Sequence, residues 1–141
     1  MPKSIRDFFI YFVAQCVLFP YKKSIRRLND MLIAIDHGNK QIKTLHHTPF
    51  TSGLIQSDAP GFGNDVLQYQ GKYYTLTNQR IPYRRDKTED ERFFILSLFA
   101  IAYEIEACGQ YTDNVMKIQL AIGLPPAHFG VQAKKFTQYF M

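Results

Sequence analysis

The residues of this chain best suited to chemistry lie in one short segment, residues 35–44, which reads Ile-Asp-His-Gly-Asn-Lys-Gln-Ile-Lys-Thr. An apolar run precedes it, so the segment is predicted to be a strand end, a tight turn and a returning strand. Asp36 at the strand end is suited to hold Mg²⁺ through water, because this ion keeps much of its hydration shell. Lys43 on the returning strand can place a positive charge beside phosphate. The segment therefore predicts a phosphate-binding β-hairpin.

The turn of this hairpin is predicted to bring a ligand close to the main chain. Gly38 has no Cβ and can adopt a positive φ, which allows such an approach. A turn of this kind aligns successive N–H groups into an anion-binding nest. The alternative is an ordinary hairpin turn, because Asp, Asn and Gly are favoured in turns for conformational reasons alone.

Residues 31–141 resemble the N-terminal part of an actin-like ATPase, closest to the bacterial plasmid-segregation actins of the ParM/StbA type. The Asp-x-Gly-x-x-x-x-Lys spacing from Asp36 to Lys43 matches the first phosphate motif of that family. A second match is the apolar strand 117–122, which runs into Gly-Leu-Pro-Pro at residues 123–126.

Two further features accompany these motifs. A helix bearing Lys134, Lys135 and Phe136 follows the second motif, as in these actins. A short hairpin at residues 66–74 stands where the family has its small second subdomain, although a hairpin alone is not a specific signal.

The resemblance implies an α/β fold, namely the N-terminal lobe of the actin-like (ribonuclease H-like) ATPase fold, truncated, with a short hairpin subdomain. It also implies ATP and Mg²⁺ as cofactors. Asp36 would order the water shell of Mg²⁺, and Lys43 would neutralise phosphate charge. Gly38, Asn39 and Lys40 would donate backbone N–H groups to the β- and γ-phosphates. Many relatives carry Ser or Thr after the motif glycine, whereas Asn39 and Lys40 here keep a donor and add positive charge.

The resemblance further implies a cytoplasmic bacterial protein that forms filaments and segregates plasmid DNA through a DNA-binding adaptor protein. The second phosphate motif, the adenosine-binding loop and the catalytic carboxylate of the family would lie beyond residue 141. We therefore expect no catalytic residue and no ATPase activity in this chain alone, although the parent protein would be an ATPase. The alternative is a catalytically inactive, truncated actin-fold module that binds a partner subunit.

The distribution of charge argues against direct contact with nucleic acid. The chain carries a formal net charge of +5, but residues 1–30 hold six basic residues against two acidic ones. The remaining 111 residues hold eleven basic and ten acidic residues. A nearly neutral lobe lacks the basic face that phosphate-backbone binding requires.

Residues 1–30 are predicted to be an extension that precedes the actin-like domain, residues 31–141. Their apolar run, residues 8–19, is shorter than the roughly 20 residues of a membrane-spanning helix. No small-residue cleavage site precedes Pro20, which argues against a signal peptide. The extension would result from a start codon assigned too early, or form an amphipathic helix packed on the lobe. Contact with a membrane surface is the weaker alternative.

The elements that position the hairpin are predicted from pattern. We expect a third strand at residues 50–55 and a strand at residues 116–122. Between them, a helix is expected to begin with a capping box formed by Thr88 and Glu91 and to end at Gly109. Its residues 93–105 are apolar nearly all round, so we expect it to be buried on most sides. Another helix is expected from Phe129 onward.

Histidines and cysteines are not predicted to form a metal site. His46 and His47 are adjacent, so on a strand they would point to opposite faces. Neither has a Cys or carboxylate at ligand spacing in the sequence. Cys16 and Cys108 are far apart in apolar settings and are expected to be free, buried thiols.

Overall fold

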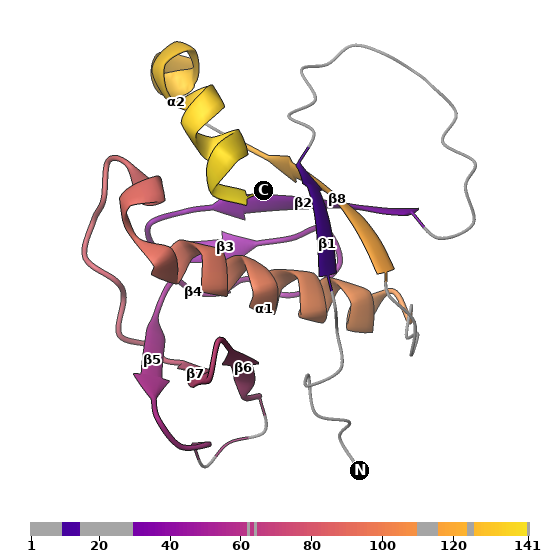
Figure 1. The fold of residues 1–141 in the computed structure, drawn as a ribbon, viewed down its shortest axis with the longest axis vertical. Helices are drawn as coiled ribbons and strands as arrows, with labels where there is room; N and C mark the ends of the chain where they lie inside the picture. The colour runs from indigo at the N-terminus through magenta and orange to yellow at the C-terminus, as the bar shows by residue number, and fades with distance from the viewer. Residues whose placement is uncertain are drawn as a thin grey trace.

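The structure is a computed structural model, and it describes residues 10–14, 30–61, 63, 65–109, 116–123 and 126–140. These residues form a mixed α/β structure with two β-sheets and two α-helices (Figure 1). The predicted α/β class is confirmed at this level. Within the described ranges, neither helix has the length and hydropathy that a membrane crossing requires.

The larger sheet has five strands in the order β1-β8-β2-β3-β4. β1 and β2 both run parallel to β8, whereas β3 is antiparallel to β2 and β4 is antiparallel to β3. The strands span Ile10–Ala14 (β1), Asp30–His37 (β2), Gln41–Lys43 (β3), Phe50–Thr51 (β4) and Met116–Ile122 (β8).

The two faces of this sheet differ because side chains alternate along each strand. On β2, Ile33 and Ile35 are buried, while Leu32 and Ala34, which alternate with them along the strand, are exposed. Ile33 lies opposite Leu120 of β8, which is also buried. One face of the sheet therefore carries the core, and the opposite face of β2 is open.

Helix α1 (Glu91–Ala107) lies between the larger sheet and a second, three-stranded sheet (Figure 1). Leu96 and Ile101 belong to the core under the larger sheet, whereas Phe99 and Tyr103 belong to a core shared with the small sheet. This position explains why α1 is apolar nearly all round, as the sequence predicted. The small sheet has the order β5-β7-β6, with β5 at Leu54–Ser57, β6 at Leu67–Tyr69 and β7 at Lys72–Leu76.

Helix α2 (Pro126–Phe140) packs on the same sheet face as α1, because Phe136 and Phe140 join the core under the larger sheet. It begins at Pro126, three residues before the predicted start at Phe129. Proline is well suited to the first helical position, where its missing N–H costs no hydrogen bond.

The predicted start of α1 is wrong, and its predicted end is confirmed. Asp90, not Thr88, caps the helix, and its carboxylate accepts a hydrogen bond from the backbone N–H of Arg92. Thr88 instead lies in a 3-10 turn (η2, Lys87–Glu89) that Asp86 caps. Gly109 follows the last turn of α1 with φ of +64°, the conformation that ends many helices.

The single strand predicted at residues 50–55 is wrong. This segment forms β4 and β5, which belong to different sheets. The chain turns at Gly53, where a Cβ atom would lie 2.3 Å from the carbonyl oxygen of Gln79. Only glycine tolerates so close an approach of another backbone. The backbone of Ser52 also accepts a hydrogen bond from the N–H of Ile81, which holds the crossing in place.

The hairpin at residues 66–74 and the strand at residues 116–122 are confirmed, as β6–β7 and β8. Gln70 and Gly71 form the turn with φ of 47° and 76°, as tight hairpins require. The helix predicted for the N-terminal extension is wrong at Ile10–Ala14, which is a strand paired with β8. The rest of that extension, including Cys16, lies outside the described residues.

Candidate phosphate site at the end of the central strands

The two strongest predicted site residues, Asp36 and Lys43, lie directly opposite each other. Asp36 is the penultimate residue of β2, and its Cα partner across the antiparallel β2–β3 pair is Lys43. Residues paired in this way project on the same side of a sheet. Both side chains are exposed on the open face. The structure therefore brings the predicted carboxylate and the predicted ammonium group together.

This pair lines a hollow of about 420 Å³. Besides Asp36 and Lys43, it is lined by Ala34, Ile35, Thr44, Leu45, Ala121, Ile122 and Gly123. The parallel strands β2 and β8 both end here, because Ile35 pairs with Ile122 in register. In open α/β sheets, ligands bind outside the carboxyl ends of parallel strands. The volume also lies within the range of small-molecule sites.

The small side chains beside the charged pair leave the hollow open. Ala34 and Ala121 are paired neighbours on β2 and β8, and each contributes only a methyl group to its floor. Gly123 follows β8 without a side chain. A larger residue at any of these positions would fill the space beside Asp36.

Gly38 does not adopt the positive φ that glycine permits. Within the described ranges, Gly71 and Gly109 are the glycines with positive φ. Gly38 is required for a different reason, since a Cβ there would lie 2.6 Å from the carbonyl oxygen of Gln41. The carbonyl of Gly38 accepts a hydrogen bond of 2.7 Å from the hydroxyl of Ser52. The glycine therefore closes the turn tightly against the neighbouring backbone.

The two remaining predicted residues do not line the hollow of Asp36. Lys40 lines a separate hollow of about 370 Å³ together with Gln41, Thr51, Asn78 and Arg80. Asn39 is half-buried, and its side-chain oxygen has no hydrogen-bond partner within the described part of the chain. The structure thus separates the side chain of Lys40 from the pair formed by Asp36 and Lys43.

His37, beside Asp36, supports the hairpin from inside the protein. Its Nε2 lies 2.5 Å from the hydroxyl oxygen of Ser97, and that hydroxyl donates to the carbonyl of Phe93 at 2.8 Å. Ser97 must therefore accept the hydrogen bond, so the proton of His37 is on Nε2. The ring also lies 5.5 Å from the ring of Phe140. Burial, assisted by the nearby charge of Lys87, lowers the pKa of His37 to about 3, so this imidazole is neutral.

Lys87 is a second cation near Asp36 that the sequence did not indicate. Its ammonium group lies 5.7 Å from the ring centroid of Phe93. Partial burial lowers the pKa of Lys87, although the negative charge of Asp36 opposes that effect. Lys87 was part of a segment without periodicity, so only the folded structure could place it here.

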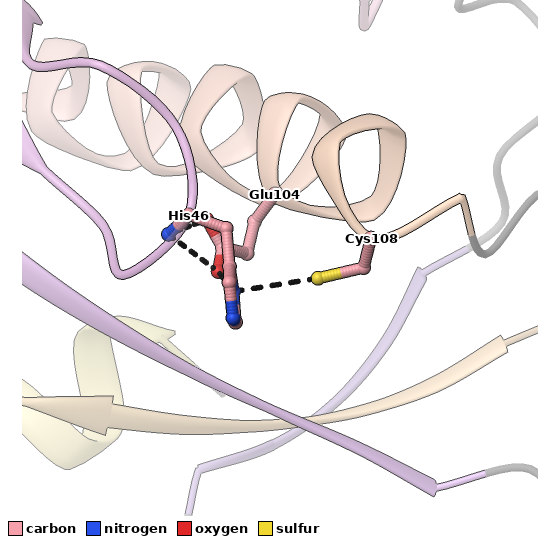
Figure 2. A group of neighbouring side chains, drawn as sticks. All are labelled: His46, Glu104 and Cys108. Carbon is pink, nitrogen blue, oxygen red and sulfur yellow. Dashed lines mark hydrogen bonds and ion pairs between the residues drawn. The ribbon is translucent and has the colours of Figure 1, made fainter.

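A second group of side chains contradicts the sequence analysis. His46, Glu104 and Cys108 converge where the loop after β3 meets the end of α1 (Figure 2). No Cys or carboxylate stands at ligand spacing from this histidine in the sequence, but the fold brings one of each beside it. Glu104 and Cys108 are some 60 residues from His46 in the sequence, so spacing along the chain could not indicate the cluster.

The chain matches none of the known protein families, curated proteins or solved structures with which it was compared. Its functional assignment therefore rests on its own residues and their geometry.

Proposed function

We propose that this chain is the nucleotide-phosphate-binding part of a bacterial actin-like, filament-forming ATPase that segregates plasmid DNA. The observation that carries the proposal is the facing pair of Asp36 and Lys43 in the hollow at the ends of β2 and β8. A carboxylate and an ammonium group beside one open space suit a Mg²⁺-phosphate ligand, which presents both positive and negative charge.

The order of elements supports the finer fold assignment that the proposal needs. Three antiparallel strands, β2–β3–β4, are followed by the small sheet (β5–β7), a helix, a parallel strand beside β2 and a second helix. We interpret this order as that of the actin and sugar-kinase superfamily. The small sheet built around β6 and β7 occupies the place in the chain where the family has its second subdomain.

In this proposal, Asp36 binds Mg²⁺ through water, and Lys43 contacts phosphate directly. The backbone N–H groups of Gly38, Asn39 and Lys40 are not assigned to the phosphate, because none of these residues lines the hollow of Asp36. The side chain of Lys40 is not assigned to the phosphate, because it lines the other hollow. The chain provides one side of the ligand site, so we expect binding of Mg²⁺-ATP without hydrolysis. In the parent protein, filament assembly would follow ATP binding, and a DNA-binding adaptor would connect filament and plasmid.

A second candidate function is an inactive module that binds a partner subunit. The open face of β2 favours it, because Leu32 there is 60 % exposed beside the small Ala34. Leu32 and Ala34 together present apolar surface that a partner subunit would cover. Under this alternative, Leu32→Glu would abolish association, whereas Asp36→Ala would have no effect.

Calorimetric titration of the 141-residue chain with Mg²⁺-ATP separates the two candidates. Asp36→Ala and Lys43→Ala are each expected to weaken binding by about tenfold, the effect of losing roughly 1.4 kcal/mol of binding free energy. Lys40→Ala is the matched control, because it removes an equal charge from the same hairpin but outside the hollow. Equal losses in Lys40→Ala and Lys43→Ala would contradict the proposal, as would unchanged binding by Asp36→Ala.

A further inference from the structure

The cluster of His46, Glu104 and Cys108 is built around a carboxylate held in a fixed position. Glu104 is only 3 % exposed, although it is charged. Both of its oxygens lie 3.1 Å from the backbone nitrogen of His46, and one also accepts from the backbone of His47 at 3.3 Å. A buried carboxylate with these donors has a defined orientation before any ligand arrives.

Cys108 and His46 complete the cluster from two different elements. Cys108 follows Glu104 by four residues, so the two side chains lie on the same face of the end of α1. The sulfur of Cys108 lies 3.4 Å from Nδ1 of His46, and this nitrogen lies 2.5 Å from Oε1 of Glu104. The three potential ligand atoms all lie within 4.8 Å of one another (Figure 2).

This geometry does not form a catalytic relay. In a nucleophile–base–acid relay, one ring nitrogen of histidine contacts the nucleophile and the other contacts the acid. Here the carboxylate and the thiol both contact Nδ1 of His46. The three groups converge on one point, which is the arrangement that a bound cation requires.

We propose that Nδ1 of His46, a carboxylate oxygen of Glu104 and the sulfur of Cys108 bind a zinc-type divalent cation. A sulfur, an imidazole nitrogen and a carboxylate oxygen are the ligands that zinc takes, whereas Mg²⁺ and Ca²⁺ prefer oxygen alone. The site is therefore chemically distinct from the hollow of Asp36. It is also independent of the proposed function.

The ligand atoms lie near, but not at, the separations of a zinc site, and the Glu104 oxygen and the Cys108 sulfur lie within 4.8 Å of each other, against about 3.6 Å in ideal tetrahedral geometry. Ideal zinc–ligand lengths and tetrahedral angles place nitrogen and sulfur about 3.5 Å apart, and nitrogen and oxygen about 3.4 Å apart. The first separation is close to the 3.4 Å between His46 and Cys108. The second requires the imidazole of His46 to move by about 1 Å away from Glu104. The side chain of His46 is 53 % exposed on a loop, so it has room to move, and water can supply the fourth ligand.

Binding changes the protonation of two groups. The thiol of Cys108 loses its proton to solvent as the sulfur–metal bond forms. The imidazole of His46 binds with its proton on Nε2 and the lone pair of Nδ1 directed to the metal, so Nδ1 gives up the proton that it donates to Glu104 when no metal is bound. Glu104 binds the metal as a carboxylate and still accepts hydrogen bonds from the backbone N–H groups of His46 and His47.

His47 provides a matched control within the same loop. Its ring stacks on the ring of Tyr103 with a centroid distance of 4.3 Å, and its Nδ1 donates to the carbonyl of Thr48 at 2.7 Å. It is thus engaged away from the three converging atoms. Substitution of His47 removes an imidazole beside the cluster without removing a ligand.

The test is a spectroscopic titration of the full chain with Co²⁺, followed by displacement with Zn²⁺. The Cys16→Ser variant serves as the parent, so that Cys108 is the sole thiol. We expect one equivalent of Co²⁺ to produce the near-ultraviolet charge-transfer band of a cobalt–thiolate bond. Zn²⁺ should then abolish that band.

Variants in this background identify the ligands. Cys108→Ser should abolish the band. His46→Ala should weaken metal binding by more than about 100-fold, because removing even a hydrogen-bond partner of a metal ligand lowers the affinity 10- to 100-fold. His47→Ala should change affinity by less than about threefold. Circular dichroism checks folding, and Cys108→Ala or His46→Asn replaces any variant that does not fold.

Three results would overturn the proposal. The first is the absence of a charge-transfer band from the Cys16→Ser chain at millimolar Co²⁺. The second is retention of the band in Cys108→Ser. The third is an equal loss of affinity in His46→Ala and His47→Ala, which would indicate adventitious binding to surface imidazoles.

Discussion

Acidification is expected to destabilise this protein through His37, the buried neighbour of Asp36. The ring is held neutral chiefly by its removal from water, and the nearby positive charge of Lys87 adds to this effect. Its second nitrogen, Nδ1, has no hydrogen-bond partner within the described residues. Protonation would place a charge, and a new N–H donor without an acceptor, in the core beneath the hairpin.

The size of the effect follows from the two pKa values. The pKa of His37 is about 3 in the folded protein and 6.5 in the unfolded chain, so the unfolded state binds the proton more tightly. The stabilisation is complete above pH 6.5 and is lost progressively as the pH falls toward 3. At about 1.4 kcal/mol per pH unit, the folded state loses about 2 kcal/mol by pH 5 and about 3 kcal/mol by pH 4.

Urea denaturation at several pH values measures this loss. The difference between wild type and His37→Phe isolates it, because Phe fills a similar volume and cannot be protonated. We expect the free energy of unfolding of His37→Phe to fall by about 2 kcal/mol less than that of wild type between pH 7 and pH 5. His47→Phe is the control and should keep the wild-type slope. Equal slopes for wild type and His37→Phe would refute the reasoning.

Three substitutions test the packing around the two sites by urea denaturation at pH 7. Glu104→Gln should lower the free energy of unfolding by about 2–4 kcal/mol. The carboxylate oxygens accept hydrogen bonds from the loop N–H groups, whereas the NH₂ group of the amide would place a second donor against them. The exposed control Glu106→Gln should stay within about 0.5 kcal/mol, and equal effects of the two would count against the carboxylate's role. Gly53→Ala should cost at least about 2 kcal/mol, because its Cβ would lie 2.3 and 2.4 Å from two carbonyl oxygens. Gly63→Ala, with no atom within 4 Å of the added Cβ, should change stability by less than about 1 kcal/mol. Phe99→Ala should cost about 3–5 kcal/mol, since this ring is fully buried between α1 and the small sheet; a loss below 1 kcal/mol would contradict that packing.

Local patterns were sufficient to predict most of the elements. The apolar run that becomes β2, the apolar length of α1 and the strand at Met116–Ile122 each depend on neighbouring residues, and all three elements are present in the structure. The pairing of Asp36 with Lys43 can also be predicted from the sequence, because a tight hairpin fixes which residues face each other.

Features that depend on backbone segments distant in the sequence could not be predicted from local patterns. The break between β4 and β5 results from the approach of residue 79 to Gly53. Gly38 is needed not for a left-handed conformation but because a Cβ there would lie too close to the carbonyl of Gln41. The capping box failed for a local reason, since Asp is a stronger N-cap than Thr: Asp90 caps α1, and Asp86 caps the preceding 3-10 turn.

The cluster of His46, Glu104 and Cys108 shows the same limit at a candidate site. Glu104 reads in the sequence as a polar interruption of an apolar helix, and its partner is some 60 residues earlier in the chain. Only the packing of the loop after β3 against the end of α1 brings the three together. A buried carboxylate in an apolar helix was the one available signal, because such a group requires a partner.

Amide NMR of the 141-residue chain titrated with Mg²⁺-ATP shows whether phosphate binds between Asp36 and Lys43. We expect the largest shift changes at Asp36, Lys43 and Gly123, around the hollow where β2 and β8 end. The largest changes at Lys40 and Arg80, which line the other hollow, would contradict this expectation, and so would a spectrum that Mg²⁺-ATP leaves unchanged at millimolar concentration.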